Sequence, residues 1–96
     1  MSLKLKGLIW IEEIVEKLAE KHDVSQDEVR EILTHDPHFQ FVEKGHRRGE
    51  DVYSAMGQSA RGRYLIVFFI HKKDGRVLIL SARDMTLAER RRYEKR

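Results

Sequence analysis

The sequence predicts one α+β domain, in which two helices precede an antiparallel four-stranded meander and a third helix follows it. Three observations carry this prediction. Apolar residues recur at helical spacing before Pro37, period-two alternation and apolar runs follow it, and a helix-start signal stands at Thr86. The length of 96 residues suits one compact core, so residues 1–96 are expected to form a single domain. We expect the meander to carry its helices on one face of the sheet.

The N-terminal third reads as two helices. Residues 8–10 form a short apolar run, expected as an edge strand or as the start of the first helix. The first helix, over 11–22, is predicted by apolar residues spaced i, i+3, i+4 and i+7, with Glu and Lys on the other face: Ile11, Ile14, Val15 and Leu18.

The second helix has a complete start signal. Ser25 is the expected N-cap, and Glu28 three residues on completes a capping box. Val24 is placed to pack onto Val29 across that cap. Pro37 stops the helix, because the residue before a proline is disfavoured in helical conformation.

Four strands are expected after Pro37. Residues 38–42 and 51–56 alternate in character, which predicts strands with two different faces. Residues 64–70 are apolar throughout, as in a central strand covered on both faces. Asp74 and Gly75 give a hairpin signal, so residues 77–80 are expected to pair back against that central strand.

The C-terminal end is strongly basic. Thr86 and Glu89 form a second capping box, which predicts a helix there. Residues 1–60 carry 8 basic and 12 acidic side chains, whereas residues 61–96 carry 11 basic and 4 acidic ones. This asymmetry indicates a polyanion or an acidic protein as partner of the C-terminal part, with a merely solvated surface as the alternative.

Composition excludes several classes of protein. No apolar run approaches the roughly 18 residues of a membrane span. The absence of cysteine rules out disulfides and suits a cytoplasmic location. No His pair or carboxylate cluster has metal-ligand spacing, and no Gly-rich loop indicates a nucleotide, so we expect no metal and no cofactor.

Four short motifs give the chain a family resemblance: Gly49-Glu50, Gly62-Arg63, Ser81-Ala82-Arg83 and Glu89-Arg90-x-x-Tyr93. With Trp10 and Lys21-His22-x-Val24, they resemble the BrnT family, RelE-like toxins of bacterial type II toxin–antitoxin systems. The resemblance implies a RelE-like sheet and ribonuclease activity. It also implies a cognate antitoxin, of the ribbon–helix–helix type, through which alone the toxin meets operator DNA.

The chain departs from that family where apolar residues replace expected polar ones: Ile11, Ile14, Leu18, Val52 and Leu78. Two interpretations remain open. Either this branch has relocated its active site, or catalysis has weakened and the partner-binding role remains.

Metal-independent RNA cleavage needs a base, an acid and cations on the phosphate. Arg83, just past the predicted last strand, and Arg63, before the central one, are candidate phosphate ligands. Their alternative role is in structural ion pairs, for Arg83 with Glu50 or Glu89. Glu50 is a candidate base, or else a cross-strand ion-pair partner. His22 is a candidate acid or base, or else a helix cap.

Further candidates bind rather than catalyse. His46, Arg47 and Arg48 form a basic loop expected to contact RNA or the partner, with plain solvation as the alternative. Arg90 and Arg91 belong to a basic helix that binds phosphates or is a solvated terminus. Tyr93 is expected to act on RNA, by stacking on a base or donating to phosphate, or to pack the last helix onto the sheet.

The predicted function is therefore that of a toxin, an endoribonuclease neutralised by its antitoxin. A non-catalytic binding module with the same fold and antitoxin interface is the alternative. A nucleic-acid-binding domain that acts through its basic tail is a third hypothesis.

Overall fold

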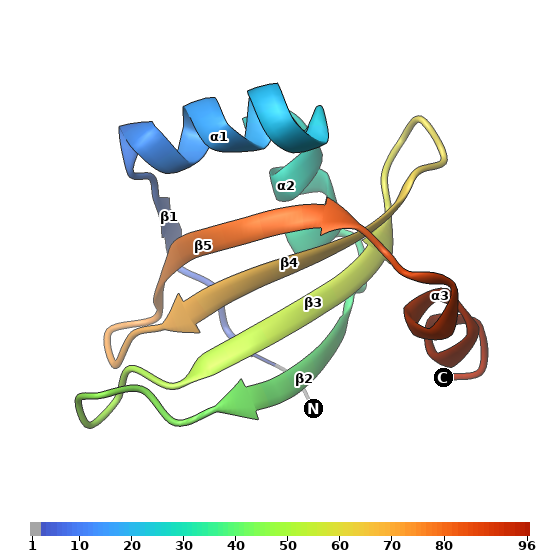
Figure 1. Cartoon of the computed structure of the whole chain (residues 1–96). Helices are drawn as coiled ribbons and strands as arrows, with labels where there is room; N and C mark the ends of the chain where they lie inside the picture. Colours follow the sequence, from blue (N-terminus) through green and yellow to red (C-terminus); the bar gives the residue numbers. More distant parts are fainter. Residues whose placement is uncertain (1–2) are drawn as a thin grey trace.

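The computed structural model describes residues 3–96 and shows an α+β fold with three helices and a five-stranded mixed sheet (Figure 1). The strand order across the sheet is β1-β5-β4-β3-β2. Along the chain the elements are β1 (Gly7–Ile9), α1 (Glu12–His22), α2 (Gln26–Thr34), β2 (His38–Glu43), β3 (Val52–Gln58), β4 (Tyr64–His71), β5 (Arg76–Asp84) and α3 (Leu87–Glu94).

The prediction of a four-stranded antiparallel sheet is wrong because it leaves out one strand. β2 to β5 form the expected antiparallel meander, but β1 adds a fifth strand that pairs in parallel with β5, with Gly7 opposite Arg76. The sequence allowed an edge strand at residues 8–10. A strand of three residues has no alternation to read, and its partner lies almost 70 positions away, so the parallel pairing left no local signal.

The last strand is longer than predicted. β5 continues past Leu80 to Asp84, so Arg83 lies within the strand and not beyond it. Phe68 pairs with Ser81 while Phe69 pairs with Ile79, which leaves Leu80 as an extra residue in a β-bulge. The bulge shifts the alternation of side chains by one position, so beyond Leu80 it is Ala82 that faces the main core, while Ser81 and Arg83 face the other side.

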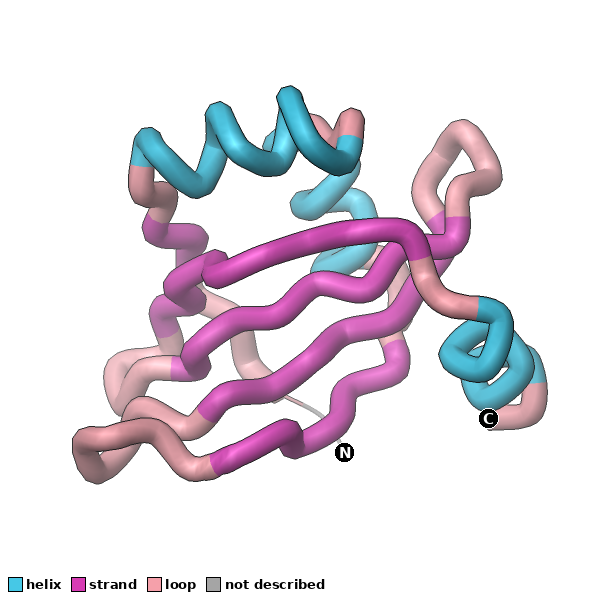
Figure 2. The backbone as a smooth tube through the Cα atoms, viewed as in Figure 1, coloured by secondary structure: helices cyan, strands magenta, loops and turns pink. Residues whose placement is uncertain are grey.

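The helices cover two faces of the sheet, not one. The inner face packs on α1 and α2 through the main core, which includes Leu18, Ile32, Val67 and Phe69. On the outer face α3 contributes the buried Tyr93 to a smaller cluster: Met56, Ile66, Tyr64, Phe68 and Met85. Figure 2 shows α3 beyond the end of β5, remote from α1. The expectation of helices on a single face is thus wrong for α3.

Both predicted capping boxes are confirmed. The Ser25 and Thr86 side chains accept from the backbone amides three residues on, and Glu28 and Glu89 return the bond. Val24 and Val29 both lie in the main core, as the predicted packing across the first cap requires. None of the helices in residues 3–96 has the length and apolar character needed to cross a membrane.

Candidate functional site

Arg83 lies on the outer face of the sheet, where its strand neighbour in register is Ile66. Its guanidinium donates to both carboxylate oxygens of Glu89, at 2.7 and 3.0 Å, and to the carbonyl of Asp84 at 3.1 Å. It also stands 5.4 Å from the centre of the Phe68 ring. The ion pair with Glu89 that the sequence offered as an alternative is therefore present, and the pair with Glu50 is not.

A second arginine and two tyrosines complete this region. The Arg90 guanidinium lies 3.9 Å from the centre of the Tyr64 ring, and Tyr93 meets Tyr64 edge to face at 6.0 Å. Tyr93 is buried against Met56 and Ile66, so it packs α3 onto the sheet. We call this group the α3 cluster: Tyr64, Phe68, Arg83, Glu89, Arg90 and Tyr93.

The charges of the α3 cluster are fixed by the Arg83–Glu89 pair. Hydrogen bonding from Arg83, helped by the Thr86 amide, lowers the pKa of Glu89 to about 2. The same bonds raise the pKa of Arg83. Glu89 is thus an anion at every physiological pH and a poor proton acceptor, and a phosphate must compete with it for Arg83.

The lowered pKa of Glu89 predicts a loss of stability in acid. The pair stabilises the fold fully above pH 4.5, the ordinary value, and the contribution is lost as the pH falls toward about 2. Because the Arg83 side chain is 34% exposed, we expect about 1–2 kcal/mol and not the larger value implied by the full shift. Urea unfolding of wild type and Glu89→Gln should differ by this amount at pH 6 and by much less at pH 3. An equal difference at both pH values would contradict it.

Arg63 ties three elements together at the same end of the sheet. It donates to the carboxylates of Glu28, at 3.1 Å, and Asp84, at 3.2 Å. It also donates to the carbonyls of His22, at 3.1 Å, and Asp23, which end α1. The guanidinium is therefore engaged by α1, α2 and β5. The structure brings Arg63 to His22, but through the backbone of His22 and on the side of the sheet that α1 and α2 cover.

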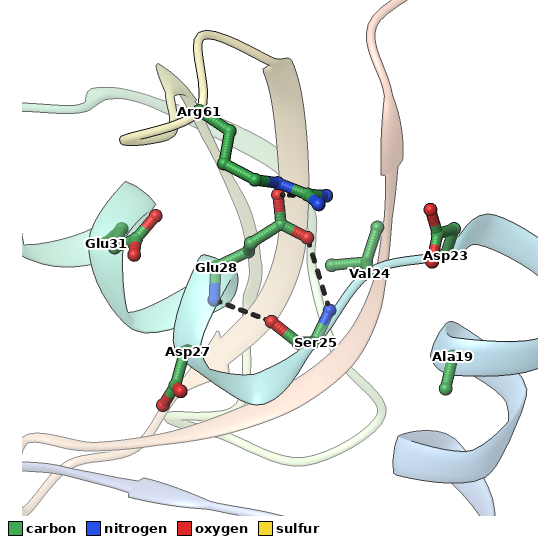
Figure 3. A pocket seen from close by; sticks show the side chains of 8 residues that line it. All are labelled: Ala19, Asp23, Val24, Ser25, Asp27, Glu28, Glu31 and Arg61. Atoms are coloured by element: carbon green, nitrogen blue, oxygen red, sulfur yellow. Dashed lines mark hydrogen bonds and ion pairs between the residues drawn. The ribbon is translucent and has the colours of Figure 1, made fainter.

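A surface pocket of about 330 Å³ lies beside this junction, and Figure 3 shows its lining. Half of its lining residues are acidic, and the two glutamates among them are already bonded to neighbouring groups. Buried Glu28 accepts from Arg61 at 3.2 Å as well as from Arg63, and Glu31 accepts from the Ala60 amide at 3.0 Å. Asp23 and Asp27 add further negative charge. Such a pocket repels RNA phosphates.

Glu50 and the basic loop occupy the opposite end of the sheet. Glu50 forms a 3.1 Å ion pair with Lys72. His46, Arg47 and Arg48 are exposed in the loop between β2 and β3. β4 spans the sheet with eight residues, so about 23 Å separates the two ends. The structure therefore does not bring Glu50 together with Arg83 or Arg63.

The five catalytic candidates thus fall into three places. Arg83 and Tyr93 share the α3 cluster, Arg63 and His22 share the helix junction, and Glu50 stands alone at the far end. Sequence reasoning missed Tyr64 and Phe68 as ring partners of arginines. In an all-apolar strand, only the even-numbered positions face α3, and uniform hydrophobicity hides that alternation.

The comparisons with known proteins give one family. The model of the ribonuclease toxin BrnT of type II toxin–antitoxin systems matches residues 10–89. None of the curated proteins compared with the chain matches it. The matched region runs from Trp10 before α1 to Glu89 in α3, and so includes every strand of the antiparallel meander. This chain therefore belongs to the BrnT family of ribonuclease toxins of type II toxin–antitoxin systems.

Proposed function

We propose that this chain cleaves RNA as an endoribonuclease toxin and holds the reacting phosphate at the α3 cluster. Membership of a ribonuclease toxin family supports the activity. The observation that supports the location is the pairing of two guanidinium groups with aromatic rings, Arg83 with Phe68 and Arg90 with Tyr64. Guanidinium forks bind phosphate, and rings beside them accept unstacked bases.

The proposed reaction needs no metal. The 2′-oxygen of one nucleotide attacks the phosphorus bound to the 3′-oxygen of the same ribose. The bond from that phosphorus to the 5′-oxygen of the next nucleotide breaks, and a 2′,3′-cyclic phosphate and a 5′-hydroxyl result. Arg83 and Arg90 stabilise the negative charge that develops on the phosphate oxygens. In the described residues the only carboxylate paired with Arg83 is Glu89, a poor base. We therefore assign both proton transfers to water.

An RNA-cleavage assay tests the location. Purified protein with EDTA should convert an unstructured RNA into fragments with 2′,3′-cyclic ends. Arg90→Ala should slow cleavage by about 10- to 100-fold, since it removes one cation from the phosphate. Arg91→Ala is the matched control, because Arg91 is exposed on the same helix without a ring partner among the described residues. Equal losses in both variants would instead favour binding through a diffuse basic tail. That outcome would support the third hypothesis.

The proposed function also includes the kind of partner that neutralises the toxin. A type II toxin family implies an antitoxin. We propose that it is a ribbon–helix–helix protein, that this chain meets operator DNA only through it, and that both act in the bacterial cytoplasm. The product of the adjacent small gene should co-purify with the chain. The complex should shift operator DNA in a gel, and the chain alone should not.

The second candidate is a non-catalytic module that binds the antitoxin. One observation favours it: Val52 and Leu78, where the family pattern has polar residues, stand on either side of Ile70 in one cross-strand row. A stable complex with the antitoxin, without RNA cleavage at any salt concentration, would establish this function in place of the first.

A further inference from the structure

The outer face of the sheet carries a row of apolar side chains that no core cluster includes. Val52 pairs with Ile70, Ile70 with Leu78, and Leu78 with Ile9, so the four stand side by side across four strands. Paired residues in a sheet project from the same face. All four are half-buried, and none belongs to either core cluster. We call these four residues the outer row.

No element in residues 3–96 packs over the outer row. α3 lies on the same face, but it packs by Tyr93 on Met56 and Ile66, near the opposite ends of β3 and β4. Figure 1 shows α3 at that end of the sheet, and the middle of the sheet without a helix in front of it. A contiguous apolar surface on a small protein indicates a binding site.

The outer row ends in a hollow with a basic rim. Val52 and Ile70 line a cavity of about 460 Å³ under the loop between β2 and β3. The rest of its lining is Glu43, Lys44, Gly45, His46, Arg47 and Glu50. Glu50 is already paired with Lys72, whereas Lys44 and Arg47 have no ion pair within the described residues. Glu43 opposes one of these two charges, so the hollow offers an apolar floor beside an excess of one positive charge.

Positive charge also bounds the outer face at its other end, where α3 carries Arg90, Arg91 and Arg92. The complementary ligand has an apolar middle and acidic ends. The aliphatic outer row has neither rings for base stacking nor donors for phosphate, so this chemistry fits a polypeptide better than RNA.

We propose that the outer row and its hollow are the docking surface of the antitoxin, which presents an apolar segment flanked by Asp and Glu. This inference rests on the proposed function. An antitoxin segment bound there lies on the same face as the α3 cluster. Neutralisation then follows from blocked access of RNA to Arg83 and Arg90, without any change in those side chains.

Two variants of the outer row and one matched control test the docking surface. Leu78→Glu places a charge in the row and should weaken antitoxin binding by about tenfold or more. Val52→Thr keeps the shape and the strand preference of valine, and should weaken binding by about 2- to 5-fold through its hydroxyl. Phe41→Glu is the control, because Phe41 is 50% exposed on the inner face beside Tyr53. It should bind as wild type does.

The measurement is calorimetric titration with the purified product of the adjacent gene, after circular dichroism has shown each variant folded. Inhibition of RNA cleavage is measured in parallel, each variant against its own rate without antitoxin. Wild-type affinity in both outer-row variants, or a loss in Phe41→Glu alone, overturns the docking surface while leaving the ribonuclease proposal intact. The docking surface is also overturned if the two outer-row variants bind RNA more weakly than wild type but bind the antitoxin as wild type does. Absence of cleavage by wild type, with binding lost in Leu78→Glu, refutes only the catalytic proposal.

Discussion

Replacing Arg63 with alanine is expected to lower the free energy of unfolding by about 3 kcal/mol, since it removes a charged donor from a buried carboxylate and leaves two carbonyls without a donor. Glu28 is only 6% exposed and would keep as donors only the exposed Arg61 and the Ser25 amide of its capping box. The carbonyls of His22 and Asp23 would lose the donor that joins the end of α1 to the sheet. Urea unfolding at pH 7, followed by circular dichroism, measures the change.

Arg30→Ala is the matched control for Arg63→Ala. Arg30 also pairs with a carboxylate at 3.2 Å, but the pair is exposed on the surface of α2, with Asp27 87% exposed. Its loss should cost less than about 0.5 kcal/mol. If Arg63→Ala were equally mild, Arg63 would not hold the helix junction, and its predicted role as a phosphate ligand would gain support. Arg63→Lys should retain charge but lose the fork, with an intermediate effect.

The features that the sequence predicts correctly are those that depend on a few consecutive residues. Each capping box needs only a Ser or Thr and a Glu three positions later, and both formed as predicted. The hairpin at Asp74-Gly75 is local in the same sense. Gly75 adopts a φ of +93°, which glycine tolerates and other residues rarely adopt.

The features that the sequence did not predict depend on distant residues. β1 finds its partner in β5, and three residues give no period from which to infer it. β5 continues past the bulge at Leu80, where the predicted strand ends, and so contains Arg83. Since a bulge moves one side chain between faces, a single extra residue decided that Arg83 meets α3 and not α2.

The candidate site depends on distant residues in the same way. The sequence predicts its single residues, but it does not predict which of them lie together in space. Arg83 and Tyr93 belong to one motif-rich stretch, and they share the α3 cluster because α3 follows β5 directly. Glu50 belongs to the loop before β3, and the seven residues of β3 run from that loop to the end of the sheet where Arg63 lies. The spacing of residues along the chain does not show which end of the sheet each of them reaches.

Truncating Tyr93 to alanine is expected to release α3 from the sheet. Tyr93 is the one residue of α3 that is buried, so the variant should lose about 2–3 kcal/mol of stability. This is less than a central aromatic residue contributes, because a detached α3 leaves the main core intact. Amide exchange should become fast in residues 87–94 and stay slow in β4.

The effect of releasing α3 on RNA cleavage distinguishes two hypotheses: a phosphate site at the α3 cluster, and diffuse binding by the basic tail. In Tyr93→Ala the arginines of α3 remain present but lose their fixed position, so Arg90 no longer lies over Tyr64. If the α3 cluster binds the phosphate, RNA cleavage should fall by about as much as in Arg90→Ala, because a misplaced cation does not stabilise the transition state. Tyr93→Phe is the control. Its hydroxyl makes no hydrogen bond within the described residues, so both stability and cleavage should match wild type. Undiminished cleavage by Tyr93→Ala would show that net positive charge suffices, and that a positioned Arg90 is not required.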